Sequence, residues 1–368
     1  SDAEGAGKVN MQSMLLETVN NVMMRMVAGK RYFGECEETK ETRRFRDLIL
    51  AIENLGEVTT IRDFFPALRW FSARQEKKFR AAFKEFDEFV QELVDQQRRK
   101  MELEEDRDRD GKRDESGVVG GYSLVEVLLS MQKTDPEFYA EEVVRGLVLV
   151  LILAGTDPSA ATVEWALSLL LNNPSTLQKA QNEIDKVVGH DRLIQESDLK
   201  NLVYLRCIIK ETLRMYPVTP LFMRSSSKDY NTNITVGEYR VPHDTMVMVN
   251  VWAIQNDPKV WDEPRKFRPE RFEEEVLLDK KGGSGGNCKI LAFGIGRRVC
   301  PGEGLAMRLI GLILGSVLQC FEWERSGEDE EEMVDMAETV GFGLFRSNPL
   351  IAKCKPRGRK SMIDLFLA

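Results

Sequence analysis

A long apolar segment limits the folds that are open to this chain. Residues 137–172 have the spacing of one helix, and the middle of that helix is apolar on all of its sides. A helix without a polar face has to lie inside a core or cross a membrane. Its longest apolar run, residues 146–155, is about half as long as the ~20 residues that span a bilayer. The sequence therefore predicts a long central helix that passes through a protein core.

Most of the remaining chain is predicted to be helical as well. Helical spacing of apolar residues recurs over residues 9–28, 45–55, 75–100, 176–188 and 197–216. Alternating patterns at 234–251 and 339–353 predict short strands, the first with a hairpin turn at 242–244. Residues 102–117 are rich in charge, which predicts a solvated loop. We expect a mainly α fold with small β-sheets, in a single domain that covers residues 1–368.

Composition excludes several classes of protein. The net charge of -8 argues against a nucleic-acid partner, because such binding rests on phosphate contacts. The six cysteines are scattered without a Cys-x-x-Cys pair, which suits neither a disulfide framework nor a zinc ribbon and predicts reduced thiols. With only two histidines, the chain has few reagents for histidine-based zinc sites or Ser-His-Asp catalysis.

A glycine-rich loop with one cysteine lies at residues 293–302 and reads Phe-Gly-Ile-Gly-Arg-Arg-Val-Cys-Pro-Gly. An apolar helical run follows, so Cys300 precedes a helix N-terminus, where free N–H groups and the helix dipole favour a thiolate. Gly294, Gly296 and Gly302 allow a tight turn and a close approach of something flat. Two interpretations remain open from this stretch alone: a thiolate that ligates a large anionic cofactor, or a buried free cysteine at a helix start.

Two charged motifs and one irregular helical stretch accompany the cysteine. Glu211 and Arg214 have i, i+3 spacing on one helix, and Arg271 lies in a proline-containing coil between aromatic residues. Each is weak by itself, since ordinary surface pairs look the same. Residues 154–159, Ala-Gly-Thr-Asp-Pro-Ser, interrupt the core of the central helix at a cost in stability. Such breaks of local rules are often functional, although a packing kink is the alternative.

Taken together and in this order, these stretches resemble the cytochrome P-450 superfamily, the haem-thiolate monooxygenases. The pattern Phe293-x-x-Gly296-x-Arg298-x-Cys300-x-Gly302 matches the family's cysteine loop. Residues 23–32, Met-Met-Arg-Met-Val-Ala-Gly-Lys-Arg-Tyr, resemble the plant microsomal group that includes isoflavone 2'- and 3'-hydroxylases. The resemblance covers essentially the whole chain. It implies a cytochrome P-450 fold that lacks the N-terminal anchor and first helices, so we expect an N-terminally truncated chain.

The resemblance assigns roles to individual residues. Residues 290–320 would form the haem-binding cysteine loop and the following helix, with Cys300 as the axial thiolate ligand of haem b. Phe293 would shield the sulfur, and Arg298 would pair with a haem propionate. Glu211, Arg214 and Arg271 would form a charge triad that fixes the region around the loop. The residues expected to line the substrate pocket are Val150, Ala154, Val218, Leu221, Phe222 and Phe342.

One residue departs from the family pattern. Pro158 stands where the family usually has a threonine whose hydroxyl helps to deliver protons to bound oxygen. Proline has no hydroxyl and no N–H, and its ring clashes with the carbonyl four residues earlier. Asp157 keeps its place, and Thr156 and Ser159 supply hydroxyls on other faces of the helix. We expect the fold to survive and proton delivery to be impaired.

The activity implied by the resemblance is hydroxylation of a hydrophobic small molecule. The oxygen atom would come from O2, and the electrons from NADPH through NADPH–cytochrome P-450 reductase, docked near Arg297 and Arg308. The substrate would be an isoflavonoid, flavonoid or other plant secondary metabolite, with lignans, indolic compounds and herbicides as alternatives. We expect the cytosolic face of the endoplasmic reticulum membrane, with a membrane surface touching the full-length protein. Two alternatives stay open: a haem-thiolate isomerase or dehydratase that acts on a hydroperoxide, and a truncated non-catalytic fragment.

Overall fold

The computed structural model describes residues 7–34, 39–53, 69–109, 122–225, 234–280, 290–327, 332–339 and 343–357. Contacts divide the chain into two compact units where the sequence predicted one domain. We call Ser13–Asp157 the helical unit, and Ser1–Gln12 with Pro158–Ala368 the cysteine-loop unit. The boundary falls at Pro158, inside the long central helix.

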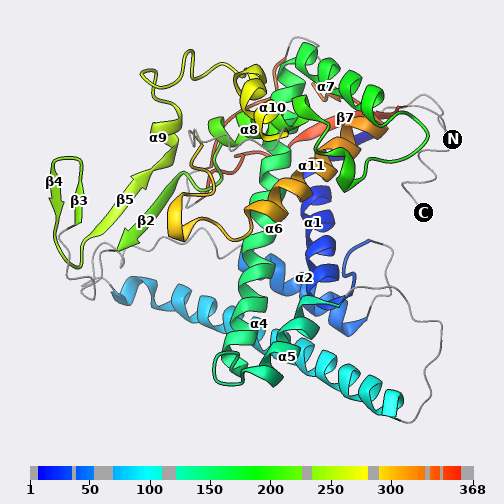
Figure 1. The fold of residues 1–368 in the computed structure, drawn as a ribbon, viewed down its shortest axis with the longest axis vertical. Helices are drawn as coiled ribbons and strands as arrows, with labels where there is room; N and C mark the ends of the chain where they lie inside the picture. Colours follow the sequence, from blue (N-terminus) through cyan, green and yellow to red (C-terminus); the bar gives the residue numbers. More distant parts are fainter. Residues whose placement is uncertain are drawn as a thin grey trace. The chain divides into compact units, whose positions relative to one another are not determined.

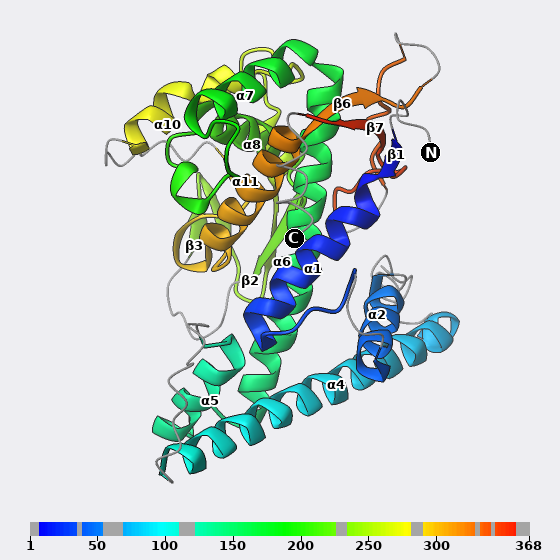
Figure 2. The same cartoon turned by 90° about the vertical axis from the view of Figure 1, so that its right-hand side faces the viewer.

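The helical unit consists of helices packed on an aromatic core. Its elements are α1 (Met11–Ala28), α2 (Lys40–Glu53), α4 (Arg69–Arg109), α5 (Leu124–Thr134) and the first part of α6 (Glu141–Asn172). The ring centres of Tyr32 and Phe45 lie 4.6 Å apart, and the Phe89 ring contacts both rings. Figure 2 shows α2 lying across α4, and this contact buries the aromatic cluster. Ser123 begins α5 with a capping box that it forms with Glu126.

Two helix limits differ from the sequence prediction. The charged segment 102–117 was predicted to be a loop, but α4 continues to Arg109, and 110–117 lie outside the described residues. The glutamates and arginines of this stretch have high helix propensity, so the helix continues without an apolar face. The central helix was predicted over 137–172 but begins at Glu141, because a turn over 136–139 precedes it. The central helix itself is confirmed, and it runs on through Pro158.

The cysteine-loop unit contains the second part of α6 and a group of further helices (Figure 1). These helices are α7 (Pro174–Val187), α8 (Val203–Met215), α9 (Val251–Gln255), α10 (Glu273–Lys280) and α11 (Glu303–Cys320), with short 3-10 turns η2 (Glu196–Asp198), η3 (Pro269–Phe272) and η4 (Gly296–Arg298). α7, α8 and α11 contact one another, and α8 also packs against η3 and α10. α8 is almost completely buried and therefore forms the centre of this unit.

Three small antiparallel sheets complete the cysteine-loop unit. β1 (Gly7–Asn10), β7 (Ile351–Pro356) and β6 (Phe321–Arg325) form the first, in that order, so that an early strand pairs with a late one (Figure 2). β2 (Leu221–Ser225) pairs with β5 (Met246–Asn250), and β3 (Ile234–Val236) pairs with β4 (Tyr239–Val241). The turn predicted at 242–244 is present at 243–244, but the hairpin predicted across it is wrong: β4 pairs with β3 through a turn at 237–238, and β5 pairs with β2.

Among the described residues, two helices, α6 and α11, are long and apolar enough to cross a membrane by length and composition alone. Their best windows have mean hydropathies of 1.6 and 1.4, and 44% and 50% of the residues in these windows are buried within the protein. Core helices of soluble proteins pass the same test, so this result is weak support for a span.

Candidate functional site

A buried charge network lies at the C-terminal end of α8. Glu211 and Arg214 are both fully buried, and their side chains form two hydrogen bonds of 2.7 and 2.9 Å. Arg271, on η3, donates to the same carboxylate at 3.1 Å. Arg214 also donates to the Pro264 carbonyl at 2.8 Å, and its guanidinium lies 5.1 Å from the centre of the Trp261 ring. The predicted contacts among the three charged residues are confirmed, and their burial excludes the surface-pair alternative.

One residue that the sequence analysis missed connects this network to the cysteine loop. Gln255 ends α9 and is fully buried. Its carbonyl accepts from Arg214 at 2.9 Å, and its side-chain nitrogen donates to the carbonyls of Leu213 and Arg214, both at 3.0 Å. Its side-chain oxygen accepts the Leu291 amide at 2.5 Å, two residues before Phe293. A glutamine in a five-residue helix carries no sequence signal for this role.

The cysteine loop is a chain of tight turns. Gly294 and Gly296 have φ values of 75° and 76°, which residues with a Cβ rarely adopt. The Cys300 amide donates to the Phe293 carbonyl at 2.8 Å, and this bond closes the loop. Gly302 then begins α11 without a side-chain cap, so the first N–H groups of that helix follow the cysteine directly. The glycines predicted to shape the loop do so at 294 and 296.

Cys300 is exposed, which excludes the interpretation as a buried structural cysteine. The residues around it present two kinds of surface. Ile295 and Val299 are exposed apolar side chains, 59% and 42% accessible. Arg298 is exposed as well, and its carbonyl accepts from Arg224 at 3.3 Å. These groups suit a flat iron cofactor with an apolar ring and anionic carboxylates: the thiol can ligate the iron, the apolar side chains can contact the ring, and the cation can pair with a carboxylate.

The irregular stretch of α6 stays helical in the structure. In the helical unit, Thr156 donates its hydroxyl hydrogen to the Ile152 carbonyl at 2.8 Å. Asp157 meets no cation or hydrogen-bond donor in the part of the chain that the structure describes, and burial raises the pKa of its carboxyl to about 6. In the cysteine-loop unit, the Pro158 carbonyl accepts from Thr162 at 2.7 Å, and Ser159 is buried.

The residues predicted to line a substrate pocket fall into three groups. Val218, Leu221 and Phe222 follow α8 in the cysteine-loop unit, with Val218 buried and Leu221 exposed. Val150 and Ala154 are both exposed on α6 in the helical unit. Phe342 lies outside the described residues. A common pocket built from all of them therefore stays a prediction.

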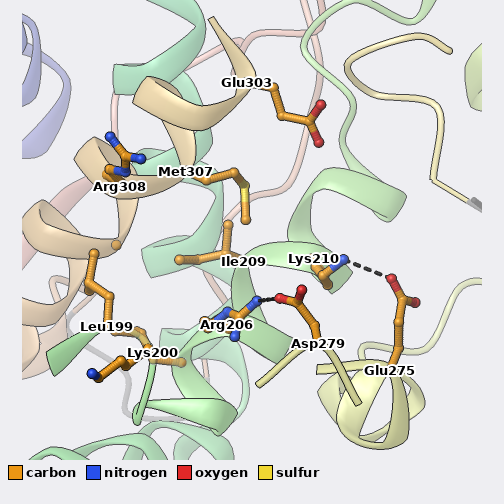
Figure 3. A pocket seen from close by; sticks show the side chains of 12 residues that line it. Leu199, Lys200, Arg206, Ile209, Lys210, Glu275, Asp279, Glu303, Met307 and Arg308 are labelled. Atoms are coloured by element: carbon orange, nitrogen blue, oxygen red, sulfur yellow. Dashed lines mark hydrogen bonds and ion pairs between the residues drawn. The ribbon is translucent and has the colours of Figure 1, made fainter. Parts of the chain in front are cut away.

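A groove of about 580 Å³ lies between α8, α10 and α11 (Figure 3). Apolar side chains form part of its lining, with Met307 of α11 and Ile209 of α8 on facing sides. Lys210 pairs with Glu275 at 2.9 Å on its rim. Arg308 was predicted to attract a reductase. Its Nε lies 3.3 Å from a carboxylate oxygen of Glu196, so this carboxylate already balances part of its charge.

Within the described residues, the chain is mainly helical with small sheets, and it carries an exposed cysteine in a tight loop just before a helix. The family model for Cytochrome P450 matches residues 1–351. The chain belongs to the cytochrome P450 family, and membership implies a haem-thiolate cofactor. The resemblance drawn from the sequence motifs is thereby confirmed, as is the mainly α fold with small sheets.

Curated plant proteins are similar to this chain over most of its length. The (+)-piperitol/(+)-sesamin synthase CYP81Q2 of Sesamum radiatum is 43% identical over 96% of this chain and 64% of its own length. Cytochrome P450 81Q32 of Catharanthus roseus is 43% identical over 97% and 65%. The isoflavone 2'-hydroxylase of Glycyrrhiza echinata is 39% identical over 95% and 64%. The chain thus spans just under two thirds of the length of these relatives.

Proposed function

We propose that this chain is part of a haem-dependent monooxygenase that hydroxylates a hydrophobic plant secondary metabolite. The observation that carries the proposal is the accessible Cys300 thiol, which lies in a glycine-turned loop directly before α11. The buried network of Glu211, Arg214 and Arg271 supports it, because Gln255 connects that network to the same loop. The names of several relatives point to aromatic plant metabolites as substrates.

In this proposal, the residues of the cysteine loop hold the haem. Cys300, just before the N-terminus of α11, would ligate the iron through its sulfur. The exposed Ile295 and Val299 would face the apolar part of the ring, and the exposed Arg298 would pair with a propionate. Phe293 holds the loop closed through its carbonyl and would shield the sulfur once the haem is bound. When bound, the haem supplies the redox chemistry for O2 activation.

Asp157 would handle protons in this reaction. With a pKa of about 6, its carboxyl can both release and take up a proton near neutral pH. The family's neighbouring threonine is replaced by Pro158, and the hydroxyl of Thr156 is engaged with the carbonyl of Ile152. Proton delivery then rests on Asp157 and water, with Ser159 as the other nearby hydroxyl. We expect more reducing equivalents to be lost as peroxide.

The proposed partners are O2 and NADPH–cytochrome P-450 reductase, at the endoplasmic reticulum membrane. The groove between α8, α10 and α11 supports a docking face here, because α11 begins three residues after Cys300. Arg206, Lys210 and Arg308 in this groove each already pair with a carboxylate of this chain. We therefore expect docking to rely on the apolar lining of the groove as well as on charge.

A haem-thiolate isomerase or dehydratase is the second candidate. The absence of a hydroxyl at residue 158 favours it, because chemistry on a preformed hydroperoxide does not need protons delivered to O2. The two candidates differ in the source of the oxygen atom.

The experiment supplies the complete protein with reductase, NADPH, an isoflavone and isotopically labelled dioxygen. A monooxygenase gives a product with one labelled oxygen, and mass spectrometry detects it. A product that forms only from an added hydroperoxide, without NADPH and without label, supports the isomerase or dehydratase. No product from isoflavones, lignans or indoles under either condition contradicts both candidates.

A further inference from the structure

The backbone of Leu344 connects two segments of the cysteine-loop unit. Its amide donates to the carbonyl of Val218 at 2.9 Å, and Val218 belongs to the predicted pocket wall after α8. Its carbonyl accepts the indole N–H of Trp165, on α6, also at 2.9 Å. A single residue thus spans from α6 to Val218 through two hydrogen bonds. Leu344 is itself buried, at 8% exposure.

Trp165 is held from two further sides. Its ring stacks on that of Tyr216, with centres 4.1 Å apart and an interplanar angle of 12°. Tyr216 is two residues before Val218, so the tryptophan contacts this segment directly as well as through Leu344. On another side, the guanidinium of Arg346 lies 5.3 Å from the Trp165 ring centre. Trp165 has no exposed surface, and its orientation is therefore fixed by packing.

Arg346, which contacts the Trp165 ring, also fixes the segment after Leu344. Arg346 is 5% exposed, and its Nε lies 3.9 Å from a carboxylate oxygen of the buried Glu164. The same oxygen accepts the Leu350 amide at 2.8 Å. Burial lowers the pKa of Arg346 and raises that of Glu164, so both charges are costly here. Apolar residues of the same size would give similar stability, which suggests that the pair serves to fix geometry.

Two backbone hydrogen bonds also hold the residues before Leu344. The Thr339 amide donates to the Phe345 carbonyl, and the Ser347 amide donates to the Ala337 carbonyl, both at 2.9 Å. A Cβ at Gly343 would lie 2.3 Å from the Phe345 ring, so a larger residue there would require this ring to shift. The chain on both sides of residues 340–342 is therefore held in one conformation.

We propose that Trp165 is a positioning residue that sets the shape of the substrate pocket through Leu344 and Val218. The proposal rests on the proposed function, because it takes Val218 as a wall of that pocket. Trp165 does not touch the substrate. It holds Tyr216 and Leu344, and these hold Val218, so a change at its indole nitrogen moves a wall several residues away.

The chain offers a matched pair of variants for the test. Trp165→Phe keeps an aromatic ring against Tyr216 and removes the indole N–H that Leu344 accepts. Trp323→Phe is the control: Trp323 is buried at 7% exposure, and its indole N–H donates to the Val317 carbonyl at the same 2.9 Å. Both variants lose one buried tryptophan hydrogen bond, so they should lose similar stability. Only Trp165→Phe is expected to change the shape of the substrate pocket.

The readout is the affinity of ferric haem in the complete protein for imidazole and for 4-phenylimidazole, measured from the shift of the haem absorption band. The ratio of the two dissociation constants reports the space above the ring, and not overall stability. Trp165→Phe should change this ratio on the order of threefold or more, as expected for one altered hydrogen bond. Trp323→Phe should leave it unchanged. An unchanged ratio in Trp165→Phe, or an equal change in both variants, overturns the proposal.

Hydrogen exchange separates this inference from the proposed function. Peptides that contain Val218 and Leu344 should exchange faster in Trp165→Phe than in Trp323→Phe, with or without haem. If the protein binds no haem, the proposed function fails, but the exchange comparison still tests the connection. Equal exchange of these peptides in both variants overturns the inference whatever the haem content.

Discussion

The side-chain oxygen of Gln255 accepts a hydrogen bond from the backbone amide of Leu291 at 2.5 Å. The other end of the same side chain bonds to the carbonyls of Leu213 and Arg214 at the end of α8. A buried glutamine therefore joins the charge network to the start of the segment that carries Cys300. This contact explains how charges on α8 and η3 can hold a loop that they do not touch.

Gln255→Leu is expected to lower haem content and stability together. The substitution leaves the Leu291 amide and the carbonyls of Leu213 and Arg214 without this partner, and each uncompensated buried group costs about 1–3 kcal/mol. Haem per protein and the midpoint of thermal unfolding measure the effect. The control is Gln178→Leu on α7, where an exposed glutamine bonds only to Asn182. Equal losses in both variants would contradict the role given to Gln255.

Glu211→Gln should destabilise the protein severely. The variant leaves Arg214, which has no exposed surface, without its carboxylate, and breaking a buried ion pair costs about 3–5 kcal/mol. Chemical denaturation measures the free energy of unfolding. Glu324→Gln serves as the comparison, because Glu324 and Lys355 form a half-exposed pair that is worth roughly 0–1 kcal/mol. A loss below 1 kcal/mol for Glu211→Gln would show that the network is not structural.

Asp157 should make stability fall as the pH rises from about 4 to about 6. Its pKa is raised by burial to about 6, so in this window the folded protein keeps a proton that the unfolded chain has lost. Above pH 6 the folded protein carries the buried charge at a cost of up to about 3 kcal/mol. Asp157→Asn removes that cost, and should be more stable than wild type at pH 7.5 but not at pH 4. Thermal unfolding of the haem-free protein at both values checks this, and a pH-independent difference would contradict it.

Pro158→Thr should increase the product formed per NADPH consumed. The substitution restores both a hydroxyl and a backbone N–H, since α6 already runs through this position without a break. Pro158→Val restores only the N–H and has nearly the shape of threonine, so it separates the two effects. We expect coupling to rise in Pro158→Thr and to stay low in Pro158→Val. Unchanged coupling in both would show that the hydroxyl is not what limits this protein.

The sequence predicted the features whose signals are local. The apolar pattern of α6, the glycines of the loop and the i, i+3 spacing of Glu211 and Arg214 each determine a nearby geometry, and the structure confirms these geometries. The role of Gln255 was not predictable, because its partners are 36 and 41 residues away and no pattern links them. The extension of α4 was missed because charge was taken as a sign of a loop, although helix propensity decided it.

The strands show a further limit of sequence reasoning. A Pro-His-Asp turn between two apolar stretches predicts a hairpin, yet β5 pairs with β2 across a separate hairpin. The choice between these pairings depends on which edge is free in three dimensions, and alternation alone does not encode it. The same holds for Leu344, whose two bonds join segments that are 126 and 179 residues away.

The central claim is that Cys300 is the thiolate ligand of a haem, and the carbon-monoxide difference spectrum of the reduced, complete protein tests it most directly. Cys354→Ser is the control, because Cys354 is a half-buried free cysteine in β7. We predict that the wild type and Cys354→Ser give the absorption band of a thiolate-ligated haem and that Cys300→Ser loses it. A thiolate band that persists in Cys300→Ser, or a wild type that binds haem without ever showing the band, would contradict the account.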